Sequence, residues 1–525
     1  MAADDFRCEL FRPHLHYPTV PYHGLLRRTV QCWPDKIATV FHKQRLTFRE
    51  LDGLSNSLAN ALAALHVTKG DRIALFMTNR PEYLISIEAA SKLGATVTPL
   101  NPAYREAEAE YQLGNSEARI VVVHEEKFPV IAAVRDRLPA IKQIVVIGDE
   151  RPPGTVNFYD LVRAGSGSEP PAVVLDLAED AMALPYSSGT TGLPKGVLLT
   201  HRNLVANATQ SAAAGRISER DTLLIFLPFY HIYGTMLMGT AVAAGATQVI
   251  MERFDLLTAL SLVEHHRVTL LYAVPPVLLA FANFSDLKKF DLSSVRYIMS
   301  GAAPLPPHVA TRVQELTGIP VLQGYGLTEA SPLTHLNPVD NPEFIRADSI
   351  GLSVSDQEEK IVDIETGTQE LGPDQIGELI VRGPHVMKGY WKAPEETARA
   401  LRDGWLYTGD IARKDKDGFV CILDRKKEMI KYKGFGVAPA ELEALLHEHP
   451  AVADCAVVAQ ADDEAGEIPK AFVVLHKNTA ASAADLMRFV ESRVAGYKRI
   501  RAVEFIDDIP KNPSGKILRR LLKHR

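Results

Sequence analysis

YSSGTTGLPKG, residues Tyr186–Gly196, is a hydroxyl- and glycine-rich stretch set between two apolar runs. Ala181–Leu184 precedes it and Val197–Leu199 follows at once, which predicts a loop joining two buried strands. Glycines let backbone N–H groups turn toward one centre, the hydroxyl groups add donors, and Lys195 supplies a positive charge. Such a loop suits a polyphosphate, although Ser/Thr/Gly stretches also serve as flexible connectors. It is not a Walker A loop, because it lacks the glycine spacing before a Gly–Lys–Ser/Thr ending.

Length, composition and charge limit the possible classes of protein. A chain of 525 residues is too long for one hydrophobic core, so we expect roughly two to four domains or subdomains. The hydrophobic content of 46% and the charged content of 23% are ordinary for a globular protein. The net charge of −6 argues against a nucleic-acid partner and against electrostatic attachment to anionic lipid.

The cysteines and the termini predict a cytoplasmic protein. The four cysteines lie far apart and form no CxxC pair, which is typical of reduced thiols and argues against structural zinc. The chain begins Met-Ala-Ala-Asp-Asp, which is acidic where a signal peptide would be basic, and it ends Lys-His-Arg, which is not a peroxisomal signal. The sequence leaves the oligomeric state open between monomer and homodimer.

One uncharged stretch tests this interpretation. Leu223–Met251 contains no Asp, Glu, Lys or Arg and is long enough to cross a bilayer. Because Pro228, His231 and several glycines interrupt it, we interpret it as a buried strand, a functional turn, a small-residue helix near 234–244 and a second strand. A membrane span is the disfavoured alternative, since irregular backbone is not tolerated against lipid.

Strand and helix patterns alternate along most of the chain. Phe48–Leu65 carries apolar residues three or four apart, Asp71–Met77 has the pattern of a strand, and Pro81–Leu93 has that of the next helix. Such alternation predicts parallel, doubly wound sheets. From about residue 349 the pattern changes to short strands. After the charge run 424–428, a unit of about a hundred residues has the pattern of a compact α+β domain.

Several loops at or near strand ends carry side chains suited to a nucleotide. His231, in LPFYHIYG, follows a buried strand where open α/β sheets bind ligands, although a hydrogen-bonded core histidine fits equally. Glu329, in QGYGLTE, suits a magnesium ion, and only its neighbours distinguish it from a surface carboxylate. Asp410, at the end of GWLYTGD, can accept both hydroxyl groups of a ribose. Lys516 lies on a Pro/Gly/Ser loop before a predicted basic helix, where it is either delivered to a distant site or solvated on a basic tail.

Six motifs in one order carry a family resemblance: YSSGTTGLPKG, LPFYHIYG, QGYGLTE, GWLYTGD, DRKKEMIKYKGFGVAPAELE and PKNPSGKILRR. Over nearly its whole length the chain resembles the adenylate-forming superfamily of acyl-CoA synthetases, 4-coumarate–CoA ligases and firefly luciferase. The resemblance implies an α/β fold with a large N-terminal domain of two doubly wound αβ subdomains plus a distorted β-barrel, followed by a small mobile α+β C-terminal domain. The implied boundaries are 1–424 for the large domain, 425–427 for a hinge and 428–525 for the mobile cap.

The resemblance also implies roles for individual residues. The ATP or AMP site would comprise Ser187, Ser188, Gly189, Thr190, Thr191, Gly192, Lys195, Ala302, Ala303, Tyr325, Gly326, Thr328, Asp410 and Arg425. The catalytic group would be Lys516, His231, Thr328, Glu329 and Lys195, with Glu329 holding the magnesium ion and His231 between the acyl pocket and the CoA channel. Lys427 matches the hinge position, and Lys431, Lys433 and Gly434 match the loop used for thioester formation with CoA.

The implied reaction converts a carboxylate, ATP and CoA into acyl-CoA, AMP and pyrophosphate in two steps. In the first step a carboxylate attacks the α-phosphate, and because two anions approach each other, Mg²⁺, Lys195 and Lys516 should neutralise the developing charge. In the second step the CoA thiol attacks the acyl-adenylate and AMP leaves. The two steps need different groups over one site, so the cap is expected to swing.

The identity of the acyl group depends on a set of small or apolar residues. The pocket would be lined by Tyr233, Met236, Val274, Ser300, Gly301, Gly324 and Ser331. No basic residue among them could receive a second carboxylate, which disfavours dicarboxylates. The stretch QGYGLTEASPLTHLNP resembles fatty acyl-CoA synthetases, so a medium- or long-chain fatty acid is the expected substrate. The alternatives are an aryl or arylalkanoic acid, as in 4-coumarate ligases, and an acyl-AMP ligase that loads a carrier protein.

The sequence disfavours two other classes of protein. A luciferase-like oxygenase is disfavoured because nothing in the sequence marks a luciferin pocket. A catalytically inactive nucleotide-binding module is disfavoured because the chain keeps the lysines, carboxylates and arginine named above.

The chain departs from the family pattern at Gly436, where many relatives have a glutamine that contacts the nucleotide or the substrate carboxylate. Either water fills the resulting gap or the pocket is wider than usual.

Overall fold

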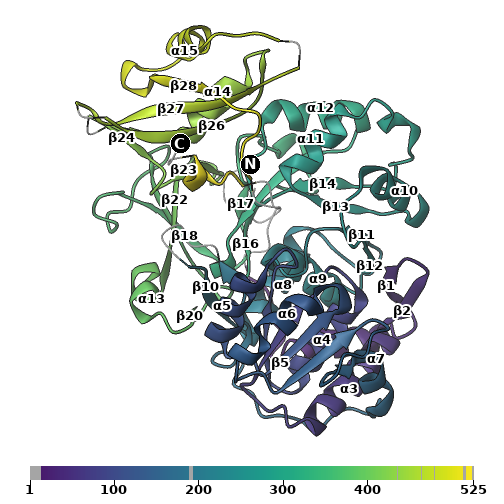
Figure 1. Ribbon diagram of the computed structural model, residues 1–525. Helices are drawn as coiled ribbons and strands as arrows, with labels where there is room; N and C mark the ends of the chain where they lie inside the picture. Colours follow the sequence, from purple (N-terminus) through teal and green to yellow (C-terminus); the bar gives the residue numbers. More distant parts are fainter. Residues whose placement is uncertain are drawn as a thin grey trace.

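The computed structural model describes residues 14–187, 193–433, 435–462, 464–477, 479–511 and 516–522. Figure 1 shows the N-terminal subdomain at the bottom, a second subdomain and an antiparallel sheet above it, and the C-terminal domain at the top. The architecture is therefore a large mixed α/β N-terminal domain with a smaller C-terminal one, as the sequence predicts.

The N-terminal subdomain contains a sheet of nine described strands, most of them parallel. Its order is β20-β10-β8-β4-β3-β5-β6-β7, with β9 paired to β10. The strands are β3 (Arg72–Phe76), β4 (Thr96–Pro99), β5 (Ile120–His124), β6 (Gln143–Ile147), β7 (Val156–Asn157), β8 (Ala181–Ala183), β9 (Tyr186–Ser187), β10 (Lys195–Thr200) and β20 (Gly389–Tyr390). Every residue of β4 is buried, as is typical of parallel strands covered on both faces.

The second subdomain contains another sheet of nine described strands, in the order β17-β16-β15-β14-β13-β11-β12-β1-β2. The strands are β1 (Ile37–Phe41), β2 (Gln44–Thr47), β11 (Thr222–Ile225), β12 (Thr247–Ile250), β13 (Leu270–Ala273), β14 (Tyr297–Ser300), β15 (Val321–Gly326), β16 (Leu333–Leu336) and β17 (Leu352–Ser353). The run from β12 through β11, β13 and β14 to β15 is parallel. The segments that follow β11, β14 and β15 therefore share one edge of the sheet, where open α/β proteins bind ligands.

Helices from both subdomains meet between the two sheets. α2 contacts α3, α4 and α9, while α3 packs on α4 and α8 packs on α9. These helices are α2 (His23–Cys32), α3 (Phe48–Ala64), α4 (Pro81–Lys92), α8 (His201–Ala214) and α9 (Ile232–Ala244). The other helices of the large domain are α5 (Glu106–Ser116), α6 (Phe128–Val134), α7 (Phe158–Ala164), α10 (Leu256–His266), α11 (Pro275–Asn283), α12 (Pro307–Thr317) and α13 (Pro394–Ala400).

The start of α8 is set by its sequence. The Thr200 side chain accepts a hydrogen bond from the Asn203 N–H, and the Asn203 side chain accepts one from the Thr200 N–H. This reciprocal arrangement satisfies two donors that would otherwise be unpaired at a helix N-terminus. β10, the strand that follows the glycine-rich loop, therefore passes directly into α8, and the capping bonds stabilise this junction.

The chain continues through an antiparallel sheet into the C-terminal domain. The sheet has the order β18-β19-β22-β21, with β23 paired to β22. Its strands are β18 (Glu358–Val362), β19 (Gly377–Arg382), β21 (Leu401–Arg402), β22 (Trp405–Lys414) and β23 (Val420–Arg425). The C-terminal domain contains β24 (Ile430–Tyr432), β25 (Phe435–Val437), α14 (Pro439–His447), β26 (Val452–Asp462), β27 (Gly466–Leu475), α15 (Ala483–Glu491) and β28 (Ala502–Phe505). It has an apolar core of its own, which includes Leu442, Val457 and Leu486.

Two sequence-based expectations have different outcomes here. The uncharged stretch 223–251 contains β11, α9 and β12, as expected, and no helix in the described part of the chain is long and apolar enough to cross a membrane. The basic helix expected after Lys516 is absent from the described residues, which form only a single 3-10 turn, η7 (Arg519–Leu521).

A buried histidine at the start of α8 predicts acid sensitivity. His201 is fully buried, and its Nδ1 accepts a hydrogen bond from the Tyr22 N–H at 3.1 Å. Burial lowers the pKa of His201 from 6.5 to about 4. Because the folded protein holds this imidazole neutral, its contribution to stability is complete above pH 6.5 and is lost as the pH falls toward 4, by about 2 kcal/mol at pH 4.5.

We therefore expect the free energy of unfolding in urea to fall between pH 7 and pH 4.5, and to fall by less in His201→Gln than in the natural chain. The glutamine keeps a polar group at this position but does not titrate. An equal fall in both proteins would contradict the role given to His201.

Candidate active site

The two flanks of the glycine-rich loop are held side by side. Ser187 of β9 lies opposite Lys195 of β10 across an antiparallel pair, as the two apolar runs predict. The expected phosphate-binding residues Ser188, Gly189, Thr190, Thr191 and Gly192 lie outside the described residues. The structure therefore describes the base of the loop, where Lys195 begins the strand that follows it.

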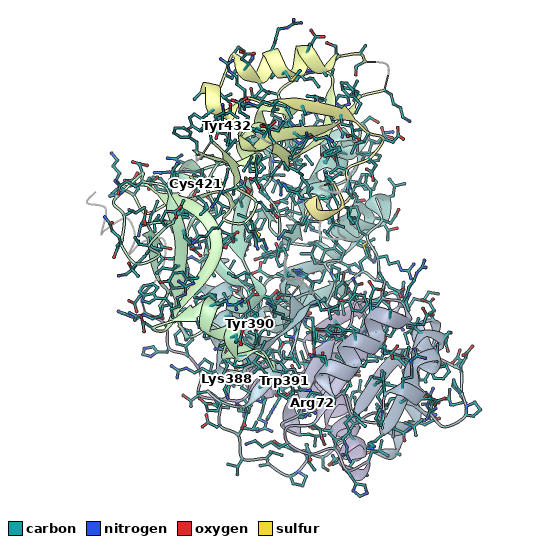
Figure 2. All side chains as sticks on the ribbon, turned by 60° about the vertical axis from the view of Figure 1, so that its left-hand side comes forward. Arg72, Lys388, Tyr390, Trp391, Cys421 and Tyr432 are labelled. Carbon is teal, nitrogen blue, oxygen red and sulfur yellow. The ribbon has the colours of Figure 1, made fainter. Side chains whose placement is uncertain are left out.

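Lys195, Tyr390 and Glu329 come together beside this base. The Lys195 Nζ lies 5.7 Å from the centre of the Tyr390 ring and 3.5 Å from Glu396 Oε1. The Tyr390 hydroxyl donates to Glu329 Oε1 at 2.8 Å. Tyr390 reaches this position because it pairs, in β20, with Val197 of β10. The next residue, Trp391, lies against Arg72 of the N-terminal subdomain, with the guanidinium 5.6 Å from the ring centre (Figure 2).

Glu329 fits a magnesium ion that is shared with a polyphosphate. Its carboxylate is oriented by Tyr390, and it lies just after β15 in the short turn η4 (Thr328–Ala330). In the described part of the chain no group of three His, Cys, Asp or Glu side chains could hold a metal alone. A single carboxylate is what Mg²⁺ requires when phosphate oxygens and water complete its shell.

A second group of residues gathers at Asp410. Asp410 of β22 and Arg425 of β23 face each other in register, and Arg425 Nε lies 2.6 Å from Asp410 Oδ1. The Tyr325 hydroxyl donates to the other oxygen, Asp410 Oδ2. The Asp410 side chain is only 3% exposed. This arrangement leaves a carboxylate in fixed orientation beside an aromatic ring, which suits a ribose and its base.

The small residues near Tyr325 allow close approach of the backbone. Ala302 has a φ of 70° and lies exposed after β14, with Ala303 half-buried next to it. A Cβ at Gly326 would lie 2.2 Å from the Pro332 carbonyl oxygen, so only glycine fits there. These three residues and Tyr325 lie at the ends of the adjacent strands β14 and β15; the family resemblance implies that Ala302, Ala303 and Tyr325 flank the adenine.

His231 is a neutral imidazole with a defined tautomer. It precedes α9, and its Nδ1 accepts the Tyr233 N–H at 3.2 Å, which assigns the ring proton to Nε2. Burial and, next, the charge of Lys516 lower the pKa of His231 to about 4. His231 can therefore donate a hydrogen bond from Nε2 at neutral pH, but it does not carry a positive charge there.

Lys516 of the C-terminal domain lies close to the Asp410 group. Burial and then the neighbouring Arg425 lower its pKa, while Asp410 and Glu428 act in the opposite direction. Lys427, at the predicted hinge, has a pKa lowered to about 8 by burial and by the charges of Arg425 and Lys516. Lys427 of the predicted hinge and Lys516 of the predicted cap thus both lie near Arg425.

Two of the residues expected to line the acyl pocket, Gly301 and Gly324, pack against Tyr233 or against Met299, which contacts Tyr233. The Tyr233 hydroxyl donates to Met299 Sδ at 3.0 Å, and its ring meets that of Tyr272 edge-on at 6.4 Å. A Cβ at Gly301 would lie 3.1 Å from the Tyr233 ring, and a Cβ at Gly324 would lie 3.1 Å from Met299 Cε. The other expected residues, Met236, Val274, Ser300 and Ser331, are buried.

Two of these expected lining residues point elsewhere. The Ser331 hydroxyl donates to the His385 carbonyl oxygen at 2.8 Å. Alternation along β14 places Ser300 on the opposite face from Met299, and it is Met299 that contacts Tyr233. The wall near Tyr233 is therefore formed by Met299 rather than by the serine that follows it.

The described residues expected to act with CoA, Lys431 and Lys433, belong to the C-terminal domain. Lys433 Nζ pairs with Glu464 at 2.5 Å on an exposed part of the C-terminal domain. Figure 2 shows Tyr432, between Lys431 and Lys433, far from Tyr390; Gly434 lies outside the described residues. Gly436 faces Lys431 across the β24–β25 pair, and a Cβ there would lie 2.9 Å from Met429 Cε, so Met429 occupies part of the space that a glutamine would need.

Sequence reasoning missed three residues that position the site. Met299 could have been found from its alternation with the buried Tyr297 on one strand. Tyr390 and Asn79 gave no comparable signal, since each acts through a tertiary contact. Asn79, buried after β3, accepts the Phe229 N–H at 2.7 Å and donates to the Leu227 carbonyl at 2.9 Å, so the N-terminal subdomain holds the turn that leads to His231.

Comparison with known families agrees with this arrangement. Residues 26–391 match the family described as AMP-binding enzyme. Residues 441–516 match the AMP-binding enzyme C-terminal domain. The two matches cover the groups around Lys195, Glu329 and Tyr325 and the domain that carries Lys516.

Individual relatives span the whole chain. A 4-coumarate–CoA ligase 1 from Petroselinum crispum is 41% identical over 532 aligned residues, covering 99% of this chain and 96% of the relative. The structure of the anthranilate CoA ligase AuaEII with anthranoyl-AMP has a TM-score of 0.88 at 30% identity, covering 100% of this chain and 98% of that one. A Mycobacterium tuberculosis fatty acyl CoA synthetase has a TM-score of 0.78 at 30% identity, covering 96% and 98%.

Proposed function

This chain belongs to the AMP-binding enzyme family and is an AMP-forming acid–thiol ligase that uses ATP and CoA; we propose that its carboxylate substrate is an aryl or arylalkanoic acid of the 4-coumarate type. The observation that carries this choice is the Tyr233 cluster. Tyr233 and Tyr272 meet edge-on at 6.4 Å, and Gly301, which has no side chain, packs against the Tyr233 ring; an aromatic surface of this kind suits a planar ring.

The relatives support the same choice. The Petroselinum crispum protein is a 4-coumarate–CoA ligase that aligns with nearly the whole chain, and the AuaEII structure holds anthranoyl-AMP, an aryl adenylate. The sequence alone favours a medium- or long-chain fatty acid. That substrate is now the second candidate, supported by the likeness to the Mycobacterium tuberculosis fatty acyl CoA synthetase.

In the proposed first step, one group of described residues would bind the ribose of ATP and another would bind its phosphates. Asp410 would accept the ribose hydroxyl groups, with Tyr325 and Arg425 fixing its orientation. Lys195 and a magnesium ion on Glu329 would neutralise the phosphates at the other end. Lys516 would stabilise the negative charge that develops as the carboxylate attacks the α-phosphate.

In the proposed second step the C-terminal domain would rotate about Lys427. This rotation would move Lys516 away from the adenylate and bring the loop with Lys431 and Lys433 to the site, beside the thiol of CoA. We propose the division 1–424, 425–427 and 428–525 for the large domain, hinge and cap. Two observations support it: the C-terminal domain has its own apolar core, and its Lys433 pairs here with Glu464 of the same domain.

The proposed acyl pocket gives a direct prediction. Gly301→Val should reduce kcat/KM for 4-coumarate by about tenfold or more, because its side chain would enter the space against the Tyr233 ring. Gly318→Val is a suitable control, since a Cβ at that exposed glycine meets nothing within 4 Å, although its φ of 73° strains a side chain. Kinetics with 4-coumarate, benzoate and acetate would test this, and an equal loss with all three acids would contradict the assignment.

The choice of substrate is tested by comparing kcat/KM for 4-coumarate, 3-phenylpropionate, octanoate and palmitate under identical conditions. The proposal expects the aryl acids to be preferred. A preference for octanoate or palmitate would reverse the order of the two candidates while leaving the ligase chemistry intact.

A further inference from the structure

The segment that carries Lys516 has little regular structure to hold it. Ile517 makes one antiparallel bridge with Lys511, and the Leu518 N–H donates to the Pro510 carbonyl at 2.8 Å. Beyond these backbone contacts, the described residues 516–522 form only η7. The position of Lys516 must therefore depend on the side chains that anchor its neighbours.

Arg519 is the strongest of these anchors. Its Nη2 lies 2.7 Å from both oxygens of Glu443 on α14, and its Nη1 lies 2.6 Å from Glu428 Oε2. Its Nε donates to the Val457 carbonyl of β26 at 3.1 Å. One guanidinium thus binds α14 through Glu443, β26 through Val457, and Glu428, the residue that follows Lys427.

This cluster is buried and geometrically specific. The side chains of Arg519, Glu428 and Glu443 are 12%, 13% and 11% exposed. The Val457 N–H also donates to Glu443 Oε1 at 2.7 Å, so the carboxylate that receives Arg519 is itself fixed. A planar guanidinium whose three nitrogens each have a different partner restricts direction as well as distance, whereas an apolar anchor such as the buried Leu522 does not fix the direction of the segment.

We propose that Arg519 is a positioning residue for the adenylation step: anchored by Glu443, Glu428 and the Val457 carbonyl, it holds the segment that presents Lys516 to the Asp410 group. Glu428 contributes twice, because it binds Arg519 and its charge also acts on Lys516. The inference rests on the role proposed above for Lys516. It adds that this role requires Arg519, which itself does not touch the substrate.

The test separates the two half-reactions. Arg519→Gln should lower carboxylate-dependent exchange of pyrophosphate into ATP by about 10²-fold, and conversion of supplied 4-coumaroyl-adenylate and CoA to thioester should stay largely unchanged. Arg519→Lys should recover only part of the exchange, because a single ammonium cannot contact Glu443, Glu428 and the Val457 carbonyl from three separate nitrogens. Arg488→Gln is the matched control, since Arg488 is 72% exposed in a surface pair with Asp485 of the same domain; it should leave both activities unchanged.

A second variant guards against loss of folding, because removing Arg519 leaves two buried carboxylates without their partner. Glu428→Gln keeps the Arg519–Glu443 pair and should lower the exchange by about tenfold with an unchanged melting temperature. If Arg519→Gln does not fold, the proposal is tested with Glu428→Gln instead. A loss of pyrophosphate exchange without a loss of thioester formation would support the proposal, and unchanged pyrophosphate exchange would overturn it.

The double variant with Lys516→Ala distinguishes positioning from general damage. In that background Arg519→Gln should cause no further loss of exchange, since residues that act as a unit are not additive. An additional loss of the same size, or an equal fall in both half-reactions, would overturn the role of Arg519. Should Lys516→Ala itself leave the exchange intact, the proposed role of Lys516 fails first, and the two failures are thereby told apart.

Discussion

Lys516→Ala is expected to reduce adenylate formation by about 10²–10³-fold, while conversion of supplied acyl-adenylate and CoA into thioester remains largely intact. The reason is geometric and electrostatic. Lys516 is half-buried near Arg425 and Asp410, at the end of the site where the carboxylate would meet the α-phosphate. A cation placed there stabilises charge that exists only in the first transition state.

Carboxylate-dependent pyrophosphate exchange measures the first half-reaction, and thioester formation from purified adenylate measures the second. Lys511→Ala is a close control, because Lys511 belongs to the same segment but pairs with Asp454 at 2.6 Å. It should change neither rate. If both half-reactions fell equally in Lys516→Ala, a C-terminal domain with two working positions would be the wrong description of this protein.

Lys427→Pro is expected to have the opposite effect, slowing thioester formation by about 10²-fold and adenylation by much less. Lys427 lies in a turn in which the N–H groups of Glu428 and Met429 donate to the Arg425 carbonyl at 2.9 and 3.1 Å. Proline fixes its own φ and restricts the preceding residue, so rotation of the domain about this turn should become difficult. The present arrangement already brings Lys516 to the Asp410 group, and adenylation therefore needs no rotation.

Lys427→Ala separates backbone stiffness from charge, because it removes the ammonium whose pKa lies at about 8 but leaves the backbone free. We expect it to retain most of the thioester activity. Rapid-quench measurement of both steps would decide. A proline variant that loses adenylation first would contradict the assignment of Lys427 as the hinge.

Much of the fold could be predicted because it depends on local patterns. The three- and four-residue spacing of leucines fixed α3, and the apolar runs around residues 186–196 fixed β8 and β10. The pairing of Asp410 with Arg425 also follows from a short connection between adjacent antiparallel strands. These features need only neighbouring residues and the periodicity of helices and strands.

The contacts that orient the site could not be predicted in the same way. Tyr390 reaches Glu329 across 61 residues of sequence, and Asn79 holds the turn at Phe229 across 150 residues. Each bond depends on how the subdomains pack, which no local pattern records. The surroundings of Tyr233 were also hard to predict, because Tyr233 contacts Met299, whereas the sequence interpretation named the adjacent Ser300.

The most direct test of the whole account measures AMP release from ATP and Mg²⁺ with a panel of carboxylates, each assayed with and without CoA. The panel should include acetate, octanoate, palmitate, benzoate, 3-phenylpropionate and 4-coumarate. The account predicts turnover that requires CoA and is fastest with an aryl acid. Adenylate and pyrophosphate formation without any CoA-dependent thioester, on every acid of the panel, would contradict it.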